Sequence, residues 1–191
     1  MEKAKPIGEI RDVYDSRIVG VRKQRMKEVA NEFDYEWAYR SPGTRALIIK
    51  ENKVLITKEF RPSQQEFDYR LPGGKVFDSL NEYKTALQKG KKFIEEQAQD
   101  ATKNECLEEV GIKTKNMNLI HISKCGATMR WELYYFLVDD FEEHEGGQQL
   151  ESGELIHPEW KTFDEVKEMC LNKEIKEDRT VAVLLRFLLQ K

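Results

Sequence analysis

Three glutamates between residues 104 and 112 have a spacing that suits metal chemistry. Glu105, Glu108 and Glu109 occupy positions i, i+3 and i+4, which lie on one face of a helix. Like charges so placed repel each other by roughly 0.2–0.5 kcal/mol per pair, and no basic residue in this stretch offsets them. Carboxylate oxygens that leave positions open for water and phosphate are ligands that Mg²⁺ and Mn²⁺ prefer. The pattern therefore predicts a hard-metal site that acts on a phosphate compound.

The other interpretation of these glutamates is a solvated acidic helix end, because 35% of the residues in the chain are charged. A turn earlier in the chain, Leu71-Pro72-Gly73-Gly74-Lys75-Val76, favours the metal site. Its two glycines allow a backbone to come close to a ligand or a metal. Ala98 and Ala101 fall within about 40° of Glu105 on a helical wheel, which suits close packing of this face under the turn. The opposite face, with Cys106, Leu107 and Val110, is expected to face the core.

Together, the glycine turn and the acidic helix resemble the signature of the Nudix hydrolase family, G-x5-E-x7-R-E-U-x-E-E-x-G-U, in which U is an aliphatic residue. Gly74 matches the opening glycine, Glu105 the glutamate after the arginine, and the paired glutamates and the ending match as well, in Cys106, Glu108, Glu109, Gly111 and Ile112. Two departures stand out. Asn104 replaces the arginine, and sixteen residues are inserted between Gly74 and this position.

The resemblance implies that Glu105, Glu108, Glu109 and a backbone carbonyl near Gly73 hold Mg²⁺, with Mn²⁺ as the alternative ion. Counting back eight residues from Asn104 places Glu96 at the first glutamate of the signature. If one helix ran through both residues, Glu96 would point about 180° away from Glu105. Glu96 is therefore a metal ligand only if the helix begins after it.

A narrower resemblance is to the ADP-ribose pyrophosphatase and nucleoside-diphosphate-sugar hydrolase group. It rests on Val54–Pro62, on the Leu-Pro-Gly-Gly that follows, and on Glu174–Ala182, and it covers roughly Asp34 to the C-terminus. In that group the arginine at the position of Arg61 contacts the substrate's phosphates, for which a planar guanidinium is suited. A surface ion pair is the alternative. Arg70 replaces a usual glutamate, which predicts a second phosphate contact, an altered specificity or simple exposure.

The same group implies where the base is held. Its members are dimers whose N-terminal strands cross to the partner, so we expect a homodimer in which Trp37, Tyr39 or Phe33 stacks on a purine. Arg130 and Trp131 form a second candidate stacking pair. Aromatic residues in strands are otherwise core residues.

A polar stretch at residues 145–154 lies where the ADP-ribose enzymes carry a loop glutamate that acts as general base. Glu154 is the first candidate for this role and Glu151 the second, with a mobile acidic loop as the alternative. The expected reaction is metal-dependent hydrolysis of the pyrophosphate of ADP-ribose or an NDP-sugar, giving a nucleoside monophosphate and a sugar phosphate. The alternatives are a non-catalytic nucleotide sensor, or an enzyme for a dinucleoside polyphosphate, a capped RNA or an oxidised nucleotide.

Strand-like and helical segments alternate along the chain, which predicts the α/β class and, with the resemblance, a Nudix-type α/β/α sandwich with a mixed β-sheet. Residues 1–40 are expected to form N-terminal strands and a candidate dimerisation element, and residues 41–191 the Nudix domain with a helical insert at about 80–95. The predicted helices are Leu80–Lys89, Lys91–Val110, Thr162–Asn172 and Asp178–Leu189. Residues 46–50 and 54–58 predict a hairpin, and 64–69 a loop.

Composition excludes several other classes of protein. The formal net charge of −3, with both signs interspersed, argues against broad nucleic-acid binding. Three cysteines without metal-type spacing argue against a zinc site or a disulfide framework. No segment approaches the ~18–20 apolar residues of a membrane span, and the start lacks the apolar core of a signal peptide. We therefore expect a cytoplasmic enzyme that is not bound to a membrane.

Overall fold

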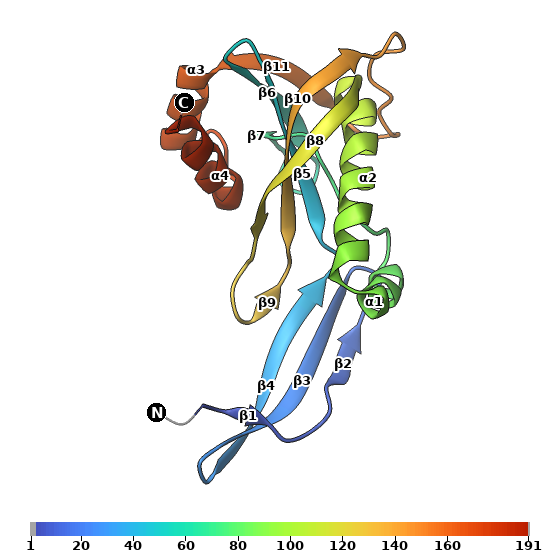
Figure 1. The fold of residues 1–191 in the computed structure, drawn as a ribbon, viewed down its shortest axis with the longest axis vertical. Coiled ribbons are helices and arrows are strands. Elements are labelled where there is room, and N and C mark those ends of the chain that lie inside the picture. The colour runs from blue at the N-terminus through green and yellow to red at the C-terminus, as the bar shows by residue number, and fades with distance from the viewer. Residues whose placement is uncertain (1–2, 191) are drawn as a thin grey trace.

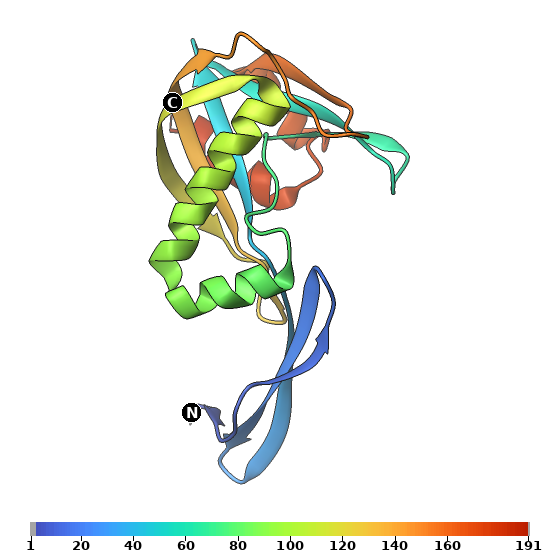
Figure 2. The ribbon, with the colours of Figure 1, turned by 90° about the vertical axis from the view of Figure 1, so that its right-hand side faces the viewer.

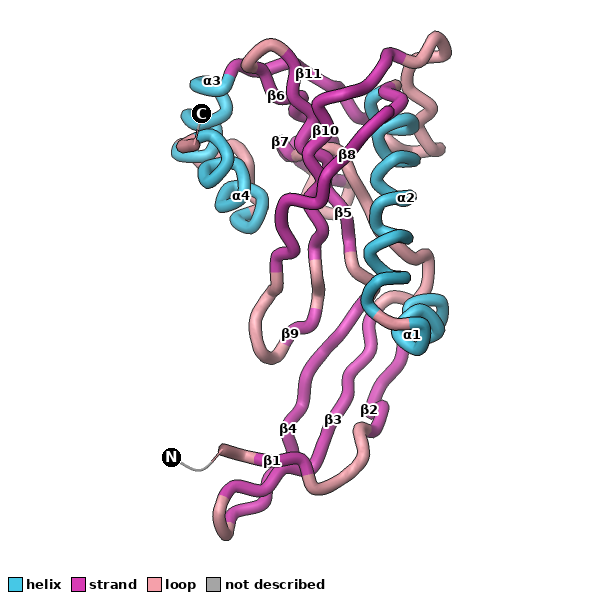
Figure 3. Tube along the Cα trace, in the orientation of Figure 1, coloured by secondary structure: helices cyan, strands magenta, loops and turns pink. Residues whose placement is uncertain are grey.

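The computed structural model describes residues 3–190 as a layered body from which a narrow β-sheet projects (Figures 1 and 3). The body is built on a sheet with the strand order β11-β6-β5-β10-β8, and β7 pairs with β6. Its strands are β5 (Gly43–Lys50), β6 (Lys53–Arg61), β7 (Glu66–Arg70), β8 (Ile112–Ser123), β10 (Leu133–Glu143) and β11 (Ile156–Thr162). Only β5 and β10 pair in parallel among these described strands, so the sheet is mixed.

Helices cover both faces of this sheet (Figure 1). The long helix α2 (Lys91–Val110) packs on one face, and α3 (Phe163–Leu171) and α4 (Asp178–Leu188) pack on the other. Each interface has its own apolar core, one around Ala46, Ala98 and Phe136 and the other around Leu47, Tyr135 and Leu184. The predicted α/β/α sandwich with a mixed sheet is confirmed. No helix within residues 3–190 is long and apolar enough to cross a membrane.

The projecting sheet, which we call the arm, consists of β1 (Lys5–Pro6), β2 (Arg11–Asp15), β3 (Val19–Glu28) and β4 (Asn31–Arg40), with β9 (Met129–Arg130) pairing on β4. It extends from the lower end of the body in both views (Figures 1 and 2). Strand β4 leads directly into β5 through Ser41 and Pro42. The arm is therefore tied to the strand that runs under the glycine turn.

The insert predicted at about 80–95 forms α1 (Leu80–Lys89) and the first turn of α2, separated by Gly90. Helix α1 joins the arm to the body. The Lys84 ammonium contacts carboxylate oxygens of Asp12 and Asp15 at 2.9 and 2.5 Å, and the Leu80 N–H donates to the Arg17 carbonyl. No described residue of α1 lines the main cavity, and α1 instead contacts the arm.

Several predicted boundaries change in the structure. Residues 66–70, expected in a loop, form β7 because their backbone pairs with β6 through Thr57–Arg61. Strand β11 was not predicted, and it pairs along the opposite edge of β6. The expected capping residue is confirmed, since the Thr162 hydroxyl accepts from the Glu165 N–H and the Glu165 carboxylate accepts from the Thr162 N–H.

Candidate active site

A cavity of about 400 Å³ opens over the C-terminal half of α2 and the glycine turn. Its volume is within the range of small-molecule sites. One side is acidic, with glutamates from α2 and from the loop after β10. The other side is basic, with arginines from β4, β5, β6 and β7. The cavity thus combines most of the predicted site residues, namely Arg61, Arg70, Gly73, Gly74, Glu105, Glu108, Glu109, Glu151 and Glu154.

Close packing explains why the turn contains two glycines. Gly73 has φ +141°, a conformation that favours glycine, and a β-carbon on it would lie 2.2 Å from the Thr44 carbonyl oxygen. A β-carbon on Gly74 would lie 2.0 Å from Glu105 Oε1. The backbone of the turn therefore rests directly on the glutamate side chain. Below it, the hydroxyls of Thr44 and Thr102 form a hydrogen bond that joins β5 to α2.

Without a bound cation, the charged forms of Glu105 and Glu109 are unfavourable. Glu109 is buried and Glu105 is half-buried. Burial first, and then the charge of Glu108, raises the pKa of Glu105 to about 7. Burial first, and then the charge of Glu105, raises the pKa of Glu109 to about 8, although the Gly73 N–H donates to Glu109 Oε2 at 2.7 Å. A bound cation would favour both carboxylates in their charged form.

The glutamate face of α2 is less exposed than the sequence indicated. Ala98, Thr102 and Glu109 are buried as fully as Cys106, because the glycine turn and β5 cover that face. Leu107, expected in the core, is only half-buried. The helix therefore has a wide buried surface that includes Glu109, with Glu105 half-buried beside it.

Glu96 lies apart from these glutamates. Helix α2 begins at Lys91 and runs unbroken through both Glu96 and Glu105, so the condition for Glu96 to be a ligand is not met. Its side chain is 57% exposed and lies 4.0 Å from the Lys92 ammonium. The structure therefore corrects the expectation that Glu96 binds metal. Asn104, which replaces the signature arginine, is exposed on the same helix.

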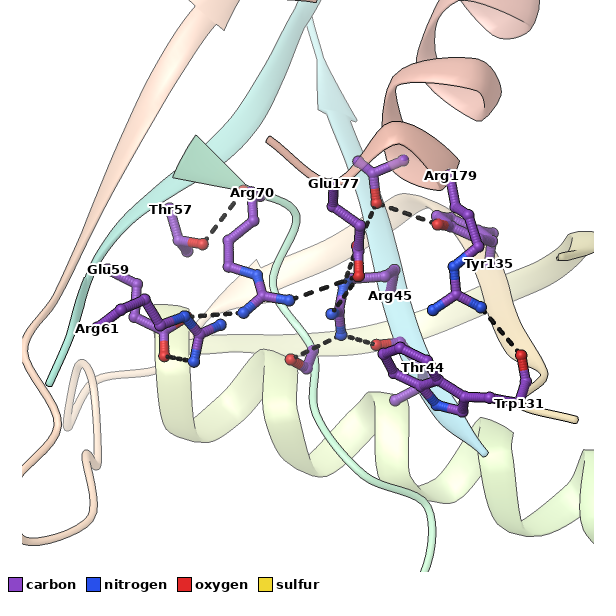
Figure 4. A network of polar contacts seen from close by, with 12 residues as sticks. Thr44, Arg45, Thr57, Glu59, Arg61, Arg70, Trp131, Tyr135, Glu177 and Arg179 are labelled. Carbon is purple, nitrogen blue, oxygen red and sulfur yellow. Dashed lines mark hydrogen bonds and ion pairs between the residues drawn. The ribbon is translucent and has the colours of Figure 1, made fainter. Parts of the chain in front are cut away.

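A buried ion pair that the sequence did not predict holds the glycine turn in place. Arg45 of β5 donates to both carboxylate oxygens of Glu177, at 3.0 and 3.1 Å, and its Nη1 donates to the Gly73 carbonyl at 3.1 Å (Figure 4). Burial opposes both charges, but the pair and the Thr180 hydroxyl hold the pKa of Glu177 below its ordinary value. The sequence signal for this pair was Arg45 itself, a charged residue directly before the apolar run 46–49.

Arg61 and Arg70 approach the cavity from neighbouring strands and share one carboxylate. Glu59 lies 2.6 Å from Arg61 Nη1 and 3.5 Å from Arg70 Nη1, and Arg70 Nη2 is 3.7 Å from Glu177 (Figure 4). Arg61 thus forms the ion pair that was its alternative interpretation, while it also lines the cavity. Arg70 is not simply exposed, since 13% of its side-chain surface is accessible.

The polar stretch at residues 145–154 folds back onto the end of α2. Gln148 donates to the Glu109 carbonyl at 2.5 Å, and the Gln149 N–H donates to the Glu108 carbonyl at 2.8 Å. Glu154 Oε2 accepts from the Glu151 N–H at 2.9 Å. Two hydrogen bonds to the C-terminal end of α2 therefore hold the loop so that both of its candidate bases line the cavity.

Trp37 and Tyr39 do not line the cavity of their own chain, and the burial of their rings corrects their expected role in stacking on a base. Both are 3% exposed and pack with Leu80 at the joint between the arm and the body. Their rings are covered by arginines, Arg130 over Trp37 at 4.0 Å and Arg22 over Tyr39 at 4.1 Å. Phe33 lies farther along the arm. The aromatic residue that lines the cavity is instead Trp131.

The donor set of the acidic side fits a divalent cation that binds oxygen. No group of three or more acidic, histidine or cysteine side chains in residues 3–190 is already close enough together to hold a metal ion. The glutamates nevertheless crowd like charges directly under the glycine turn, and the raised pKa values of Glu105 and Glu109 make both poor anions without a cation. Oxygen ligands without cysteine or histidine favour Mg²⁺ or Mn²⁺ over softer ions.

Comparison with known proteins settles the family. The profile of the NUDIX domain matches residues 39–183. This chain belongs to the Nudix family. The predicted enzyme class, a Nudix pyrophosphohydrolase, is confirmed by that match and by the Nudix fold. No curated protein is similar enough in sequence to count as a relative.

The fold of this Nudix protein recurs in solved structures. One is a crystal structure described as an ADP compounds hydrolase, with a TM-score of 0.71 and 14% identity. The alignment covers 100% of the present chain and 94% of that chain, so the arm and the insert are included in the aligned length. At this identity the likeness shows a shared fold.

Proposed function

We propose that this Nudix protein hydrolyses the pyrophosphate bond of ADP-ribose or an NDP-sugar in the presence of Mg²⁺ or Mn²⁺. The observation that carries the proposal is the division of one cavity into a carboxylate side and an arginine side. A diphosphate needs both, because its oxygens are shared between cations and guanidiniums. The solved ADP compounds hydrolase of similar fold supports a nucleotide substrate of this kind.

In this proposal Glu105, Glu108, Glu109 and the Gly73 carbonyl hold the cations. The Gly73 carbonyl already accepts from Arg45, and its second lone pair remains for a cation. A bound divalent ion supplies polarisation of the phosphates and lowers the pKa of a coordinated water. Arg61 and Arg70 orient the diphosphate, and the ion pairs with Glu59 and Glu177 hold their guanidiniums in the cavity.

Glu154 is our candidate for the residue that takes the proton from the attacking water. It lines the cavity, and its charge, like that of Glu151, contributes to the raised pKa of Glu105. The loop contacts through Gln148 and Gln149 hold it near the metal-facing carboxylates. Proton transfer from water to Glu154 would leave hydroxide to attack one phosphorus, with the other phosphate as leaving group.

Incubation with ADP-ribose and a panel of NDP-sugars, with either metal or with EDTA, tests the proposal by measuring the nucleoside monophosphate released. We expect release of AMP from ADP-ribose that stops with EDTA. Tight binding of one of these compounds without turnover would overturn the hydrolase proposal and favour a sensor. Turnover confined to dinucleoside polyphosphates, capped RNA or oxidised nucleotides would overturn the proposed substrate class.

We also propose that the protein works as a homodimer that pairs through the arm. Apolar side chains of the arm, including Ile7, Ile10, Val13, Tyr14 and Ile18, are about half-exposed. So many exposed apolar side chains on and beside one narrow sheet favour an interface with a partner. The arm carries no residue of the cavity except Arg40 at its base, so pairing would build on a site formed largely within one chain.

A further inference from the structure

Arg40, at the end of β4, is a cation of the cavity with no described carboxylate partner. Arg45 pairs with Glu177, and Arg61 and Arg70 pair with Glu59, but no carboxylate within residues 3–190 forms an ion pair with Arg40. Its charged neighbours are the cations Arg179 and Arg45. Burial first, and then these two charges, lower the pKa of Arg40. A half-buried guanidinium in such surroundings is unfavourable without an anion.

Trp131 holds this guanidinium in place. Arg40 lies over the indole with its guanidinium carbon 4.6 Å from the ring centre, and Arg179 lies over the same ring at 4.1 Å. Arg179 also donates to the Trp131 carbonyl at 3.0 Å, which fixes the tryptophan (Figure 4). With two guanidiniums on it, the ring is already used as a stacking surface. It therefore offers a base little room and serves to orient Arg40.

Unsatisfied donors gather in the same cavity. Among residues 3–190, four buried side-chain polar atoms lack a hydrogen-bond partner, and three are N–H donors of cavity-lining residues, Arg40 Nε, Arg70 Nε and Trp131 Nε1. Buried polar groups normally have partners, so orphaned donors beside a cavity indicate acceptors that arrive with a ligand. Phosphate and carboxylate groups are ligands made of acceptors alone.

The Arg40 end is separate from the Arg61 end. Trp131 and Arg179 lie on one side of Arg45, whereas Arg61 and Glu59 lie on the other (Figure 4). Arg40 also lines an adjoining hollow of about 170 Å³, where Lys75 pairs with Asp78 and Arg17 adds a further basic residue. The basic side of the site therefore has two groups of cations, and one diphosphate at Arg61 and Arg70 leaves the other group without an anion.

We infer that Arg40, oriented by Trp131, is a specificity-determining residue that binds an anionic group on the sugar of the substrate, beyond the diphosphate. This inference rests on the proposed hydrolysis and names its substrate class, a nucleoside diphosphate linked to a sugar that carries a phosphate or a carboxylate. A guanidinium bound to such a group forms charge-assisted hydrogen bonds, which are stronger than those to a hydroxyl. The preference for the charged sugar then depends on Arg40.

Two matched substrate pairs test this inference and distinguish the two anions. ADP-ribose is compared with its 1″-phosphate, and UDP-glucose with UDP-glucuronate, by kcat/KM with Mg²⁺. We expect the charged member of at least one pair to be preferred about tenfold. In Arg40→Gln this preference should fall to about one, with kcat/KM for the neutral member changed less than about threefold. Arg40→Lys should keep part of the preference, and Arg25→Gln, a surface change on the arm, should leave it intact.

Equal losses for both members in Arg40→Gln would place Arg40 at the shared diphosphate and overturn the inference, as would no preference in the unmodified protein. Binding of the same pairs without metal, measured by calorimetry, separates this inference from the proposed hydrolysis. Charge-selective binding that Arg40→Gln removes, without any turnover, would sustain the inference and overturn the hydrolysis. Turnover in which the preference for the charged member survives Arg40→Gln would do the reverse, and no binding of any member would overturn the inference.

Discussion

Gly74 and Glu105 are in such close contact that a β-carbon on residue 74 would lie 2.0 Å from Glu105 Oε1. Thirty-one positions separate them in the chain, including the whole insert. The insert thus leaves the contact between the glycine turn and the acidic helix intact. It enters as α1 and extends the N-terminal end of α2, away from the glutamates.

Gly74→Ala is expected to displace the Glu105 carboxylate and reduce metal-dependent turnover by at least about a hundredfold, because small misplacements at a reacting centre are costly. The fold should survive, since the carboxylate lies at the far end of a flexible side chain. Turnover and thermal unfolding of the variant check both statements. Gly8→Ala, at a glycine whose β-carbon would lie 3.4 Å from Arg25 Cβ, controls for the loss of a glycine. Unchanged turnover in Gly74→Ala would show that Glu105 has no part in the reaction.

Glu109→Gln and Glu96→Gln should differ sharply, although both change one glutamate of the same helix. Glu109 is buried in the cavity and Glu96 is exposed beside Lys92. We expect Glu109→Gln to lose at least about a hundredfold in turnover, as loss of a metal ligand should cost more than loss of its outer-shell support. Glu96→Gln should retain wild-type turnover. Steady-state kinetics across a Mg²⁺ titration compare the two variants. A larger loss of turnover in Glu96→Gln than in Glu109→Gln would mean that the metal face has been assigned to the wrong glutamates.

The metal-free protein should lose the stability contributed by Glu105 and Glu109 as the pH rises from about 4.5 to about 8. The pKa of Glu105 is raised to about 7 and that of Glu109 to about 8, so the folded chain holds protons that the unfolded chain has released. The stability this contributes is present at low pH and is lost as the pH passes through those values. Urea unfolding in EDTA should show it, with a flatter profile for Glu109→Gln. Added Mg²⁺ should reverse the trend, because it binds the charged carboxylates.

Removing one partner of the buried Arg45–Glu177 pair should be strongly destabilising. Glu177→Gln leaves a buried guanidinium without its carboxylate and is expected to cost about 3–5 kcal/mol in the free energy of unfolding. The turn should also loosen, because Arg45 donates to the Gly73 carbonyl. Asp100→Asn, which breaks an exposed pair with Lys103, should leave the unfolding midpoint nearly unchanged. A double-mutant cycle with Arg45→Met measures the coupling, and additive losses would contradict it.

The proposed dimer predicts that apolar arm residues control the mass in solution. Sedimentation should give twice the mass of the chain, and Val13→Lys with Ile18→Lys should shift the protein to the monomer. Leu171→Lys, at an exposed apolar residue of the body, is the matched control and should not. A monomeric unmodified protein at micromolar concentration would remove the arm's proposed role.

Local sequence patterns determined a large share of this protein. The two glycines, the i, i+3, i+4 glutamates, Gly90 and Gly111 as helix ends and the capping Thr162 were all readable because each depends on geometry within a few residues. The hairpin of β5 and β6 was likewise local. Strands β7 and β11 were not, since edge pairing with β6 rather than their own composition makes them strands.

Only the tertiary structure decided which charges meet. Arg45 and Glu177 are 132 positions apart, and Arg40 meets Trp131 only because β4 pairs with β9. No spacing in the sequence could therefore predict either contact. The structure also removed Glu96, Trp37 and Tyr39 from the site, because helix phase and burial direct a side chain as firmly as its chemistry does. The sequence by itself predicted the carboxylates that line the cavity, and the fold decided the arginines that face them. Short-range rules set the former, whereas long-range packing and the cost of buried charge set the latter.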